Sequence, residues 1–473
     1  MATRLEEIGV TVAEPIRQDG PSGTRIPKER YTSPDWLALE YERLWPRVWQ
    51  MACRIEEVPQ AGDFMEYRIG DQSVLIVRDG SDSIRAYHNA CLHRGTRLCI
   101  DRGNAGDALL CRFHGWSWNL DGSIAEVPDA PDFPPENIGR RELQLPEVHV
   151  DTWGGFVFVN MAEEPGPLLD FLAPIPERLA PFEVDKMRLL RHRTTIMDCN
   201  WKVGLDAFNE AYHVEATHVW DLSGMAGGAR SISRAAYGVG DESGQRINVR
   251  NAAGATPGSY AFTYEAFETH NMMRNAPRTE SSVRLGDLDG DPRTFVLQVL
   301  EEQRQISLAH QDEIDFVRSL ESIPLGMTAK ELQLWVRREV GIAGGIDYSH
   351  INDDDLMSAI DYCLYPNMVG PISAGNWILF RFRPNGDDPD TCIFDVFFLH
   401  RYPEGEEPSG VDHEWYADWR EHDDWGSTLL QDLANMGLVQ QGLHQRSFRA
   451  TRLNRQEAGI RNHHEFLDRY MGV

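Results

Sequence analysis

The sequence predicts an α+β protein in two parts, a small all-β domain followed by a larger domain that combines an antiparallel sheet with helices. From about residue 62 to 160, short alternating runs are separated by turn residues such as Asp79-Gly80 and Asp121-Gly122, which is typical of β-hairpins. Beyond residue 200, longer stretches with a helical period alternate with strand-like runs. A length of 473 residues also favours two or three domains over one.

The individual elements follow from the local pattern. Residues 33–50 have a helical period behind a Ser-Pro start, the usual sign of a helix N-terminus. The same period predicts helices at about 200–218, 293–321, 328–341 and 425–445, the last being the final helix, and strands are expected at about 360–382 and 391–402. Residues 221–290 are rich in small residues without a period, as in active-site loops or lids.

Composition excludes several classes of protein. Hydrophobic residues make up 41% of the chain, enough for a substantial core. The 46 basic and 74 acidic residues leave a formal charge of 46 − 74 = −28, which argues against nucleic acid or an anionic membrane as partner. The first 20 residues lack an apolar signal core, and the longest apolar runs, 155–159 and 377–380, are too short to cross a bilayer. A cytoplasmic location is therefore expected. In such a protein, an odd number of cysteines, here seven, favours free thiols or metal ligands over a set of disulfide bonds.

Two short segments carry a candidate metal centre. Cys91 and His93 are followed by Cys111 and His114, with 111 − 93 − 1 = 17 residues between the pairs. Two thiolates and two imidazoles suit either a Cys2His2 zinc site or a [2Fe–2S] cluster with two cysteines on one iron and two histidines on the other. A zinc finger usually pairs its cysteines on one turn and its histidines on another. Here each loop carries one of each, which favours the Rieske-type cluster.

A second candidate centre follows between residues 200 and 218. Two histidines and one carboxylate can occupy one face of a non-haem iron and leave positions open for dioxygen. His213 and His218 are five residues apart, so on a regular helix they would diverge by roughly 140°. If both bind one metal, the helix must be irregular at 214–217. An ordinary helix with two surface histidines is the alternative.

These segments together resemble the Rieske non-haem iron oxygenases, in particular the catalytic α subunit of the aromatic ring-hydroxylating dioxygenase family. The resemblance rests on Cys-Leu-His-Arg-Gly at 91–95, Cys-Arg-Phe-His-Gly-Trp at 111–116, Asn-Trp-Lys at 200–202 and Glu-x-Tyr-His-x4-His at 210–218. It covers nearly the whole chain. It implies a Rieske domain at 46–160, a helix-grip catalytic domain at 161–473, and an N-terminal helical segment at 1–45 that packs with the catalytic domain.

The resemblance also implies roles for single residues. Cys91, His93, Cys111 and His114 would hold the [2Fe–2S] cluster, and His213, His218 and Asp432 the mononuclear Fe(II). Asp432 lies in a late segment similar to the one that supplies the third ligand in the family, whereas the acidic run 353–355 competes only by composition. Glu210 would link an iron histidine to a cluster histidine of the neighbouring subunit, although many family members have aspartate there. Asp206-Ala207 departs from the frequent Glu-Asn, so Asp206 receives no role.

The implied activity is that of a terminal oxygenase. It would take electrons from a ferredoxin or flavin reductase and use O2 to hydroxylate, and preferentially dihydroxylate, a small aromatic or apolar organic substrate. The alternative is a monooxygenase that performs N- or O-demethylation or single hydroxylation. Electron transfer between subunits implies a homotrimer, to which a β subunit could be added.

The charge pattern adds one expectation. Four arginines, at positions 94, 97, 102 and 112, lie in or beside the cluster loops of this acidic chain. They could form a positive docking patch for an acidic ferredoxin, and charge reversal at Arg97 or Arg102 would then weaken reduction by the partner. Alternatively, they brace the loops by pairing with nearby carboxylates.

Overall fold

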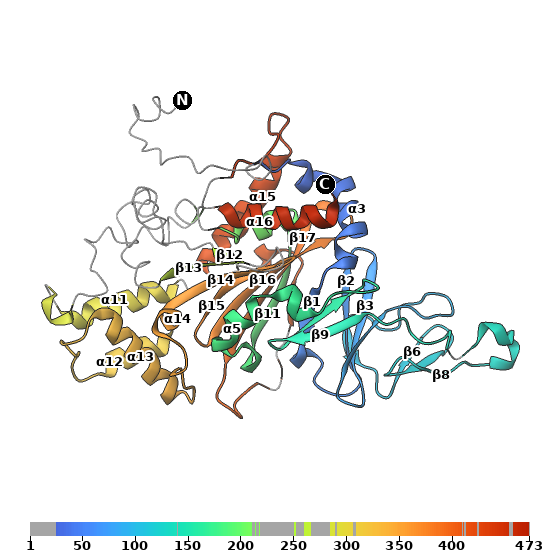
Figure 1. The fold of residues 1–473 in the computed structure, drawn as a ribbon, viewed down its shortest axis with the longest axis horizontal. Coiled ribbons are helices and arrows are strands. Elements are labelled where there is room, and N and C mark those ends of the chain that lie inside the picture. Colours follow the sequence, from blue (N-terminus) through green and yellow to red (C-terminus); the bar gives the residue numbers. More distant parts are fainter. Residues whose placement is uncertain are drawn as a thin grey trace.

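The two-part α+β architecture expected from the sequence is confirmed. The computed structural model describes residues 25–139, 141–210, 213, 217, 250–251, 260–265, 284–288, 291–305, 309–408, 410, 413–422, 425–453 and 457–472. A small β-rich body lies at one end of a large sheet, and a group of helices formed by residues 292–343 lies at the other (Figure 1). None of the helices in this described part is long and apolar enough to cross a bilayer.

The small body contains three antiparallel sheets. Their strand orders are β1-β10-β9, β4-β3-β2-β5 and β6-β7-β8. The strands are β1 (Gln50–Arg54), β2 (Asp63–Ile69), β3 (Gln72–Arg78), β4 (Ile84–His88), β5 (Arg102–Asn104), β6 (Ala108–Leu110), β7 (Ser117–Asn119), β8 (Ile124–Glu126), β9 (His149–Trp153) and β10 (Phe156–Asn160). The loop after β4 and the loop between β6 and β7 both contribute cysteines to one buried apolar cluster with Leu109 and Trp118.

The larger body is built on an eight-stranded sheet in the order β12-β13-β14-β15-β16-β17-β11-β18. Neighbouring strands are antiparallel except β11 and β18, which run parallel. The strands are β11 (Met187–Met197), β12 (Arg250–Asn251), β13 (Tyr260–Glu265), β14 (Ser358–Leu364), β15 (Met368–Ser373), β16 (Asn376–Asn385), β17 (Asp388–Arg401) and β18 (His413–Tyr416).

The two faces of this sheet belong to different cores, because side chains alternate along a strand. Phe380 and Phe394 face the core that also contains residues of helices α6, α15 and α16, whereas Trp377 and Phe397 face a core shared with β1 and β10.

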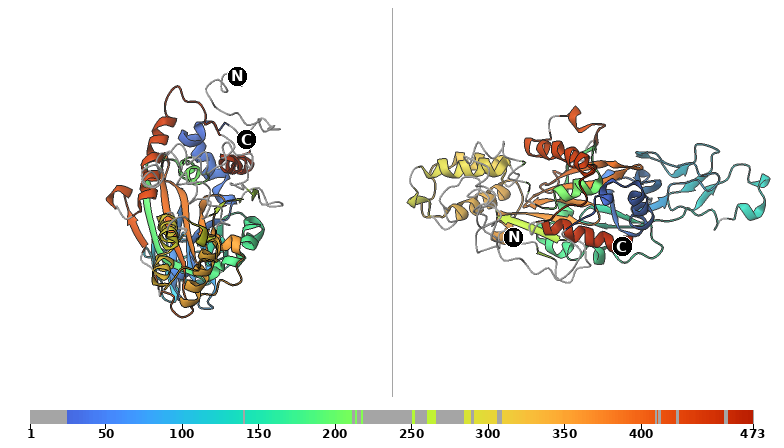
Figure 2. Two further views of the ribbon diagram at one scale, coloured as in Figure 1. Left: turned by 90° about the vertical axis from the view of Figure 1, so that its left-hand side faces the viewer. Right: turned by 90° about the horizontal axis from the view of Figure 1, so that it is seen from above.

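The helices are α2 (Glu29–Thr32), α3 (Pro34–Arg43), α4 (Leu168–Leu172), α5 (Ile175–Leu179), α6 (Trp201–Ala207), α11 (Pro292–Gln305), α12 (Gln311–Ser319), α13 (Ala329–Ala343), α14 (Asp353–Met357), α15 (Ser427–Leu443) and α16 (Ala458–Met471). Figure 2 shows α15 and α16 on the same side of the sheet.

The N-terminal helices are fastened to the start of α6. Glu40 on α3 is only 1% exposed and accepts hydrogen bonds from Trp201 Nε1 at 2.8 Å and Lys202 Nζ at 2.5 Å. Such a buried ion pair depends on both partners, and removing one typically costs about 3–5 kcal/mol. The Asn-Trp-Lys segment therefore holds α6 against the N-terminal helices.

Several expected helix boundaries were wrong. The helix expected at 33–50 ends at Arg43, because Pro46 cannot continue the backbone hydrogen bonding and a short 3₁₀ turn leads into β1. The helix expected at 200–218 ends at Ala207, where Phe208 packs on Phe380 with ring centroids 4.4 Å apart. The segment 293–321 forms two helices, α11 and α12.

The chain also contains elements that local pattern did not predict. The segment 425–445 is followed by a further helix, α16, and β11 pairs along its length with β17. The strands expected at 360–382 are β14, β15 and most of β16. Most of the loop segment 221–290 lies outside the described residues.

Candidate active site

The two cysteine-containing loops have the same backbone construction. In each, the glycine four residues after the cysteine donates its amide to the cysteine carbonyl, Gly95 to Cys91 at 2.8 Å and Gly115 to Cys111 at 3.0 Å. Both glycines have positive φ, +78° and +76°, a conformation that disfavours residues with a Cβ. Two different patterns, Cys-x-His-x-Gly at 91–95 and Cys-x-x-His-Gly at 111–115, therefore form the same tight turn, and the two turns face each other.

The four candidate cluster ligands meet where these turns approach. Cys91 and Cys111 are 4% and 1% exposed, and the rings of His93 and His114 lie 4.7 Å apart. Burial raises the pKa of the Cys91 thiol. Burial also opposes ionisation of Cys111, but hydrogen bonds from backbone amides and from the neighbouring thiol hold its pKa below the usual value. Two thiols on the inner side and two imidazoles on the outer side fit a [2Fe–2S] cluster ligated unequally at its two irons.

The histidines are supported differently. His93 stacks on Trp116 at 5.0 Å with an interplanar angle of 7°, and its Nδ1 is buried without a hydrogen-bond partner among the described residues, as expected of a ligand atom. Burial and the nearby His114 lower the pKa of His93, which favours the neutral form that binds metals. His114 is exposed beside Phe113, which is 54% exposed. The tip of the domain thus presents one histidine to the outside.

The second candidate centre joins the segment after α6 to helix α15. His213 Nε2 lies 3.5 Å from a carboxylate oxygen of Asp432, and Asp432 is 6% exposed. On the other side of the ring, His213 Nδ1 donates to Glu210 Oε1 at 2.8 Å, while the His213 backbone amide donates to Glu210 Oε2 at 3.1 Å. Nε2 is therefore directed toward Asp432 with the tautomer set by Glu210, the arrangement of a metal-binding histidine with an outer carboxylate.

The remaining part of this centre is only partly described. His218 lies outside the described residues, as do Tyr212 and positions 214–216 of the expected irregular turn. The amide of Thr217 bonds the His213 carbonyl at 2.9 Å. Two members of the competing acidic run have partners elsewhere: Asp353 on α14 pairs with Arg338 at 2.7 Å, with its side chain 63% exposed, and Asp355 accepts a hydrogen bond from Asn352 at 2.6 Å.

One acidic residue near this centre was missed by the sequence reasoning. Asp361 on β14 is 8% exposed, and burial raises its pKa to about 8, an effect that the positive charge of His213 partly offsets. It lies on the same face of the sheet as Cys363, which packs in the core with α15. The signal for Asp361 in the sequence was a single carboxyl group within a strand-like run. Carboxyl groups are rarely buried unless they are paired or functional.

A cavity of about 320 Å³ opens on this same face of the sheet. Pro371, the cross-strand partner of Asp361, lines it together with Asn376 and Phe398. His310 also lines the cavity and accepts a hydrogen bond from the Asn376 amide at 2.7 Å, and burial lowers the pKa of His310. The lining of the cavity therefore combines an aromatic ring with polar groups, and the buried Asp361 lies on the neighbouring strand, outside this lining.

The arginines around the cluster loops divide into two kinds. Arg97 pairs with Glu66 at 2.7 Å and Arg102 with Glu57 at 3.5 Å, so these two brace the loops through local carboxylates. Arg94 lies over the Phe113 ring at 5.1 Å. Arg112 is exposed and has no ion pair within the described ranges. If a docking patch exists, Arg112 is a better candidate than Arg97 or Arg102.

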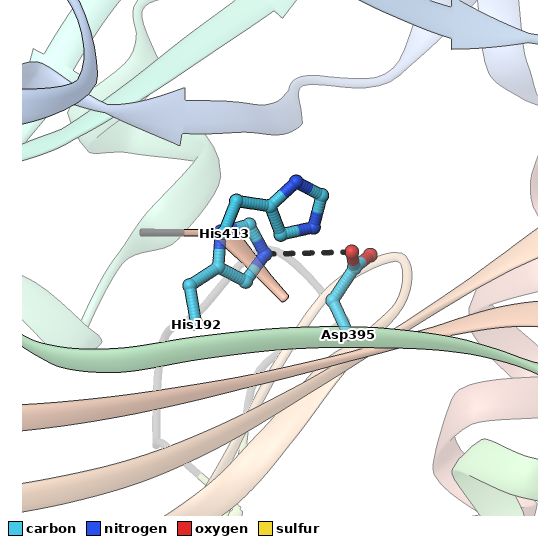
Figure 3. A group of neighbouring side chains, drawn as sticks. All are labelled: His192, Asp395 and His413. Atoms are coloured by element: carbon cyan, nitrogen blue, oxygen red, sulfur yellow. Dashed lines mark ion pairs between the residues drawn. The ribbon is translucent and has the colours of Figure 1, made fainter. Parts of the chain in front are cut away.

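Another group of two histidines and a carboxylate lies in the sheet beside the small body. Figure 3 shows His192 directed toward Asp395, with the His413 ring stacked on it at 4.2 Å. His192 Nε2 is 3.5 Å from Asp395 Oδ1. Two guanidinium groups, Arg381 at 2.8 Å and Arg383 at 3.1 Å, already pair with Asp395. Their charges hold its pKa well below the usual range against the effect of burial, and they would repel a metal cation.

This group instead connects the two bodies. Arg381 Nη1 donates to the backbone carbonyl of Met51 on β1 at 2.8 Å, and His192 Nδ1 lies 3.4 Å from Glu57. Burial lowers the pKa of His192, but the combined effect of the nearby Asp395 and Glu57 outweighs burial, so its pKa lies above the usual value. We interpret the group as a buried ionic layer that holds the small body on the sheet.

Two family models match the chain. The family model described as "Rieske [2Fe-2S] domain" matches residues 48–144. The model described as "Ring hydroxylating alpha subunit (catalytic domain)" matches residues 178–473, which is more than half of the chain. The first range contains all four candidate cluster ligands, and the second contains Glu210, His213 and Asp432.

Similar individual proteins include oxygenase subunits that act on quaternary ammonium compounds. The chain is 32% identical over 195 residues to the glycine betaine monooxygenase oxygenase subunit of Chromohalobacter salexigens, covering 41% of this chain and 43% of that protein. It is 30% identical over 198 residues to the chloroplastic choline monooxygenase of Spinacia oleracea, covering 41% and 44%. The matched part thus spans less than half the length of these relatives.

Solved structures share the fold over nearly the full length. A quaternary ammonium Rieske monooxygenase matches with a TM-score of 0.61 and 18% identity, covering 94% of this chain and 95% of that one. Naphthalene 1,2-dioxygenase with indole bound matches with a TM-score of 0.62 and 17% identity, covering 96% and 93%. At this identity the two structures establish the fold and do not distinguish between the two activities.

Proposed function

Because the chain belongs to the family of ring-hydroxylating oxygenase α subunits, with a Rieske [2Fe–2S] domain and a mononuclear iron catalytic domain, we propose that it is the oxygenase component of a monooxygenase. Its substrate in this proposal is a small quaternary ammonium compound. The observation that carries the proposal is the similarity to glycine betaine and choline monooxygenases, which are named for single oxygenation of such substrates. The aromatic dihydroxylation favoured by the sequence reasoning has support only from structures that share the fold.

The ligand assignment is part of the proposal. Cys91, His93, Cys111 and His114 would hold the cluster, and His213, His218 and Asp432 the iron. The cluster supplies single electrons, and the iron supplies oxygen activation at its open positions. The burial of the two thiols and the approach of His213 Nε2 to Asp432 support these roles.

Glu210 has a positioning role in this scheme. Both of its oxygens accept hydrogen bonds from His213, which orients the ring and keeps the proton on Nδ1. The outward-facing His114 would allow the cluster of one copy to approach Glu210 of the next. A closed ring, most simply a homotrimer, would repeat this contact in every subunit. Electrons would enter from a ferredoxin or reductase partner.

Asp361 favours a cationic substrate. A quaternary ammonium group has no N–H donor, so a protein recognises it through negative charge and aromatic faces. Asp361 offers a carboxyl that has no hydrogen-bond or ion-pair partner in the described part of the chain, and Phe398 offers an aromatic ring in the adjoining cavity. A bound cation would favour the ionised form of Asp361.

The domain limits are also a proposal. Residues 46–160 would form the cluster domain and 161–473 the catalytic domain, while residues 1–45 would belong with the latter. The contacts of Glu40 with Trp201 and Lys202 support this grouping for α3.

The function is tested with purified protein, a competent reductase and NADH. Glycine betaine, choline, carnitine and naphthalene are compared by oxygen uptake and product analysis. We expect uptake coupled to an oxygenated or demethylated product with at least one quaternary ammonium compound, and none with naphthalene. Coupled cis-dihydroxylation of naphthalene, with no turnover of the three cations, would replace this proposal by the aromatic dioxygenase alternative.

A further inference from the structure

A third group of two histidines and a carboxylate lies apart from the two iron centres, where three helices meet. Asp206 of α6, His463 and His464 of α16 come together with Tyr31 of α2. His463 Nδ1 lies 3.8 Å from Asp206 Oδ1, and His464 Nε2 lies 3.4 Å from Asp206 Oδ2. Tyr31 donates its hydroxyl to Asp206 Oδ2 at 2.8 Å. Tyr31, His463 and His464 are no more than 3% exposed.

Two atoms in this group have no hydrogen-bond partner among the described residues. They are Asp206 Oδ1 and His463 Nδ1, both fully buried. His463 Nε2 lies 2.9 Å from the Pro366 carbonyl, which can only accept, so Nε2 carries the ring proton. In the neutral ring, Nδ1 then presents a lone pair toward a carboxylate oxygen. Two acceptors that face each other in a buried site are unfavourable unless something positive lies between them.

The surrounding charges do not supply that positive group. The nearby cations are already paired, Arg30 with Asp468 at 2.6 Å and Lys202 with Glu40 at 2.5 Å. No lysine or arginine in the described part of the chain forms an ion pair with Asp206, and the buried oxygen Oδ1 faces the lone pair of His463 Nδ1.

We propose that Asp206, His463 and His464 form a second metal site for a small divalent ion of the zinc type. Imidazole nitrogens and a carboxylate oxygen are the ligands that zinc accepts, and three protein ligands leave a fourth position for water. The Pro366 carbonyl orients one imidazole and Tyr31 orients the carboxylate, as outer partners do in metal sites. The contrast with the His192 group supports the assignment, because there two arginines occupy the carboxylate that a metal would need.

Two contacts of His464 must rearrange when the ion binds. Tyr31 Oη lies 3.0 Å from His464 Nε2 and would keep only its hydrogen bond to Asp206. Arg30 Nη1 lies 3.4 Å from His464 Nδ1, and coordination through Nε2 places the proton on Nδ1, so two donors would face each other. Arg30 can turn fully toward Asp468, with which it already pairs. The ion would then cross-link α6 with α16, and α6 leads directly to Glu210 and His213.

The proposal is tested by element-specific metal analysis of the full chain. Zinc can also enter the catalytic iron site, so the comparison uses the Asp432→Ala variant with its [2Fe–2S] cluster intact. After zinc loading and exhaustive dialysis, we expect about one zinc per chain in D432A and loss of that zinc in D432A/H463Q. X-ray absorption at the zinc edge should give only nitrogen and oxygen neighbours at about 2.0–2.1 Å. The exposed His444 supplies the control, D432A/H444Q, which should keep the zinc.

Equal zinc in D432A and D432A/H463Q would overturn the proposal, as would sulfur neighbours in the zinc-edge spectrum. Correct folding is judged by acid-labile sulfide and the Rieske spectrum. If H463Q prevents folding, Asp206→Asn provides the same comparison with a side chain of the same shape. These measurements use no substrate, so their outcome is independent of the proposed quaternary ammonium specificity.

Discussion

The two proposed iron centres are built in different ways. The cluster ligands come from two turns of the same construction, each closed by a hydrogen bond from its own glycine to its own cysteine. The mononuclear centre joins His213 to Asp432, which are 432 − 213 = 219 residues apart, across the contact between the segment after α6 and α15. The first site is therefore largely local, whereas the second depends on the packing of the whole catalytic domain. Mutations in the two regions should have separable effects.

The largest effect should come from removing a cluster thiolate. Cys111→Ala removes one of the two thiolate ligands of one iron, so the Rieske spectrum and the acid-labile sulfide should disappear. Turnover should fall by more than about 100-fold, which exceeds the loss typical when a hydrogen-bond partner of a metal ligand is removed. Ferrous iron binding at the catalytic site should persist, because its residues belong to another domain. Loss of iron from both centres would show that the sites are not independent.

The complementary change is Asp432→Ala. Turnover should fall by a similar factor because a metal ligand is lost, while the cluster keeps its spectrum and its sulfide. Asp355→Ala, in the acidic run on α14, is the matched control and should keep full iron and activity. If instead D355A lost the iron and D432A retained it, the ligand assignment would be wrong.

A moderate effect is expected at Glu210, the residue proposed to connect the centres. Glu210→Gln weakens the charge-assisted hydrogen bond to His213, and turnover should fall about 10- to 100-fold with both metal contents unchanged. In a single turnover, the reduced cluster of E210Q should be oxidised slowly by substrate and O2. Glu210→Asp should recover part of the rate, because aspartate is frequent there in the family. Normal cluster oxidation in E210Q would exclude the positioning role.

Asp361 should make the catalytic domain sensitive to pH. Burial raises its pKa in the folded protein to about 8, above the value of the unfolded chain, so the folded state binds more protons. The unfolding free energy of iron-free protein should therefore decrease as pH rises from about 4 to 8, by up to about 1.4 kcal/mol per unit. Denaturant titrations at several pH values should give a flatter curve for Asp361→Asn. An identical slope in both proteins would contradict the assignment.

The smallest effects are expected at the surface arginines. Arg112→Glu should slow reduction by an acidic electron donor several-fold at low salt and flatten its salt dependence, without changing stability. Arg97→Glu breaks the pair with Glu66 and should cost about 1 kcal/mol or less, because Arg97 is partly exposed. Stopped-flow reduction and thermal unfolding separate these outcomes. If R97E slowed reduction more than R112E, Arg97 would be part of the docking patch, as the sequence pattern suggested.

Much of this protein was predictable from sequence because the decisive chemistry is local. The spacing of Cys91, His93, Cys111 and His114 indicates the cluster without any tertiary information, since each loop closes on itself through its own glycine. The family models confirm the Rieske domain and the catalytic domain that this pattern implied. The separation of the chain into a β-rich part and an α+β part also follows from periodicity alone.

Tertiary structure decided the features that depend on residues distant in sequence. Helix α6 ends at Ala207, and the next residue, Phe208, packs against sheet residues more than 170 positions later, a contact that no local pattern reveals. The raised pKa of Asp361 results from its burial in the assembled domain, near His213. Asp206 comes close to His463 and His464 only because α16, a helix that the sequence reasoning did not predict, packs near α6. Local hydrogen bonds determine the shape of the two cluster turns and thereby the positions of the ligands that they carry. The pKa and the partners of a buried group depend on the surrounding chain, and these emerge only when the domain is assembled.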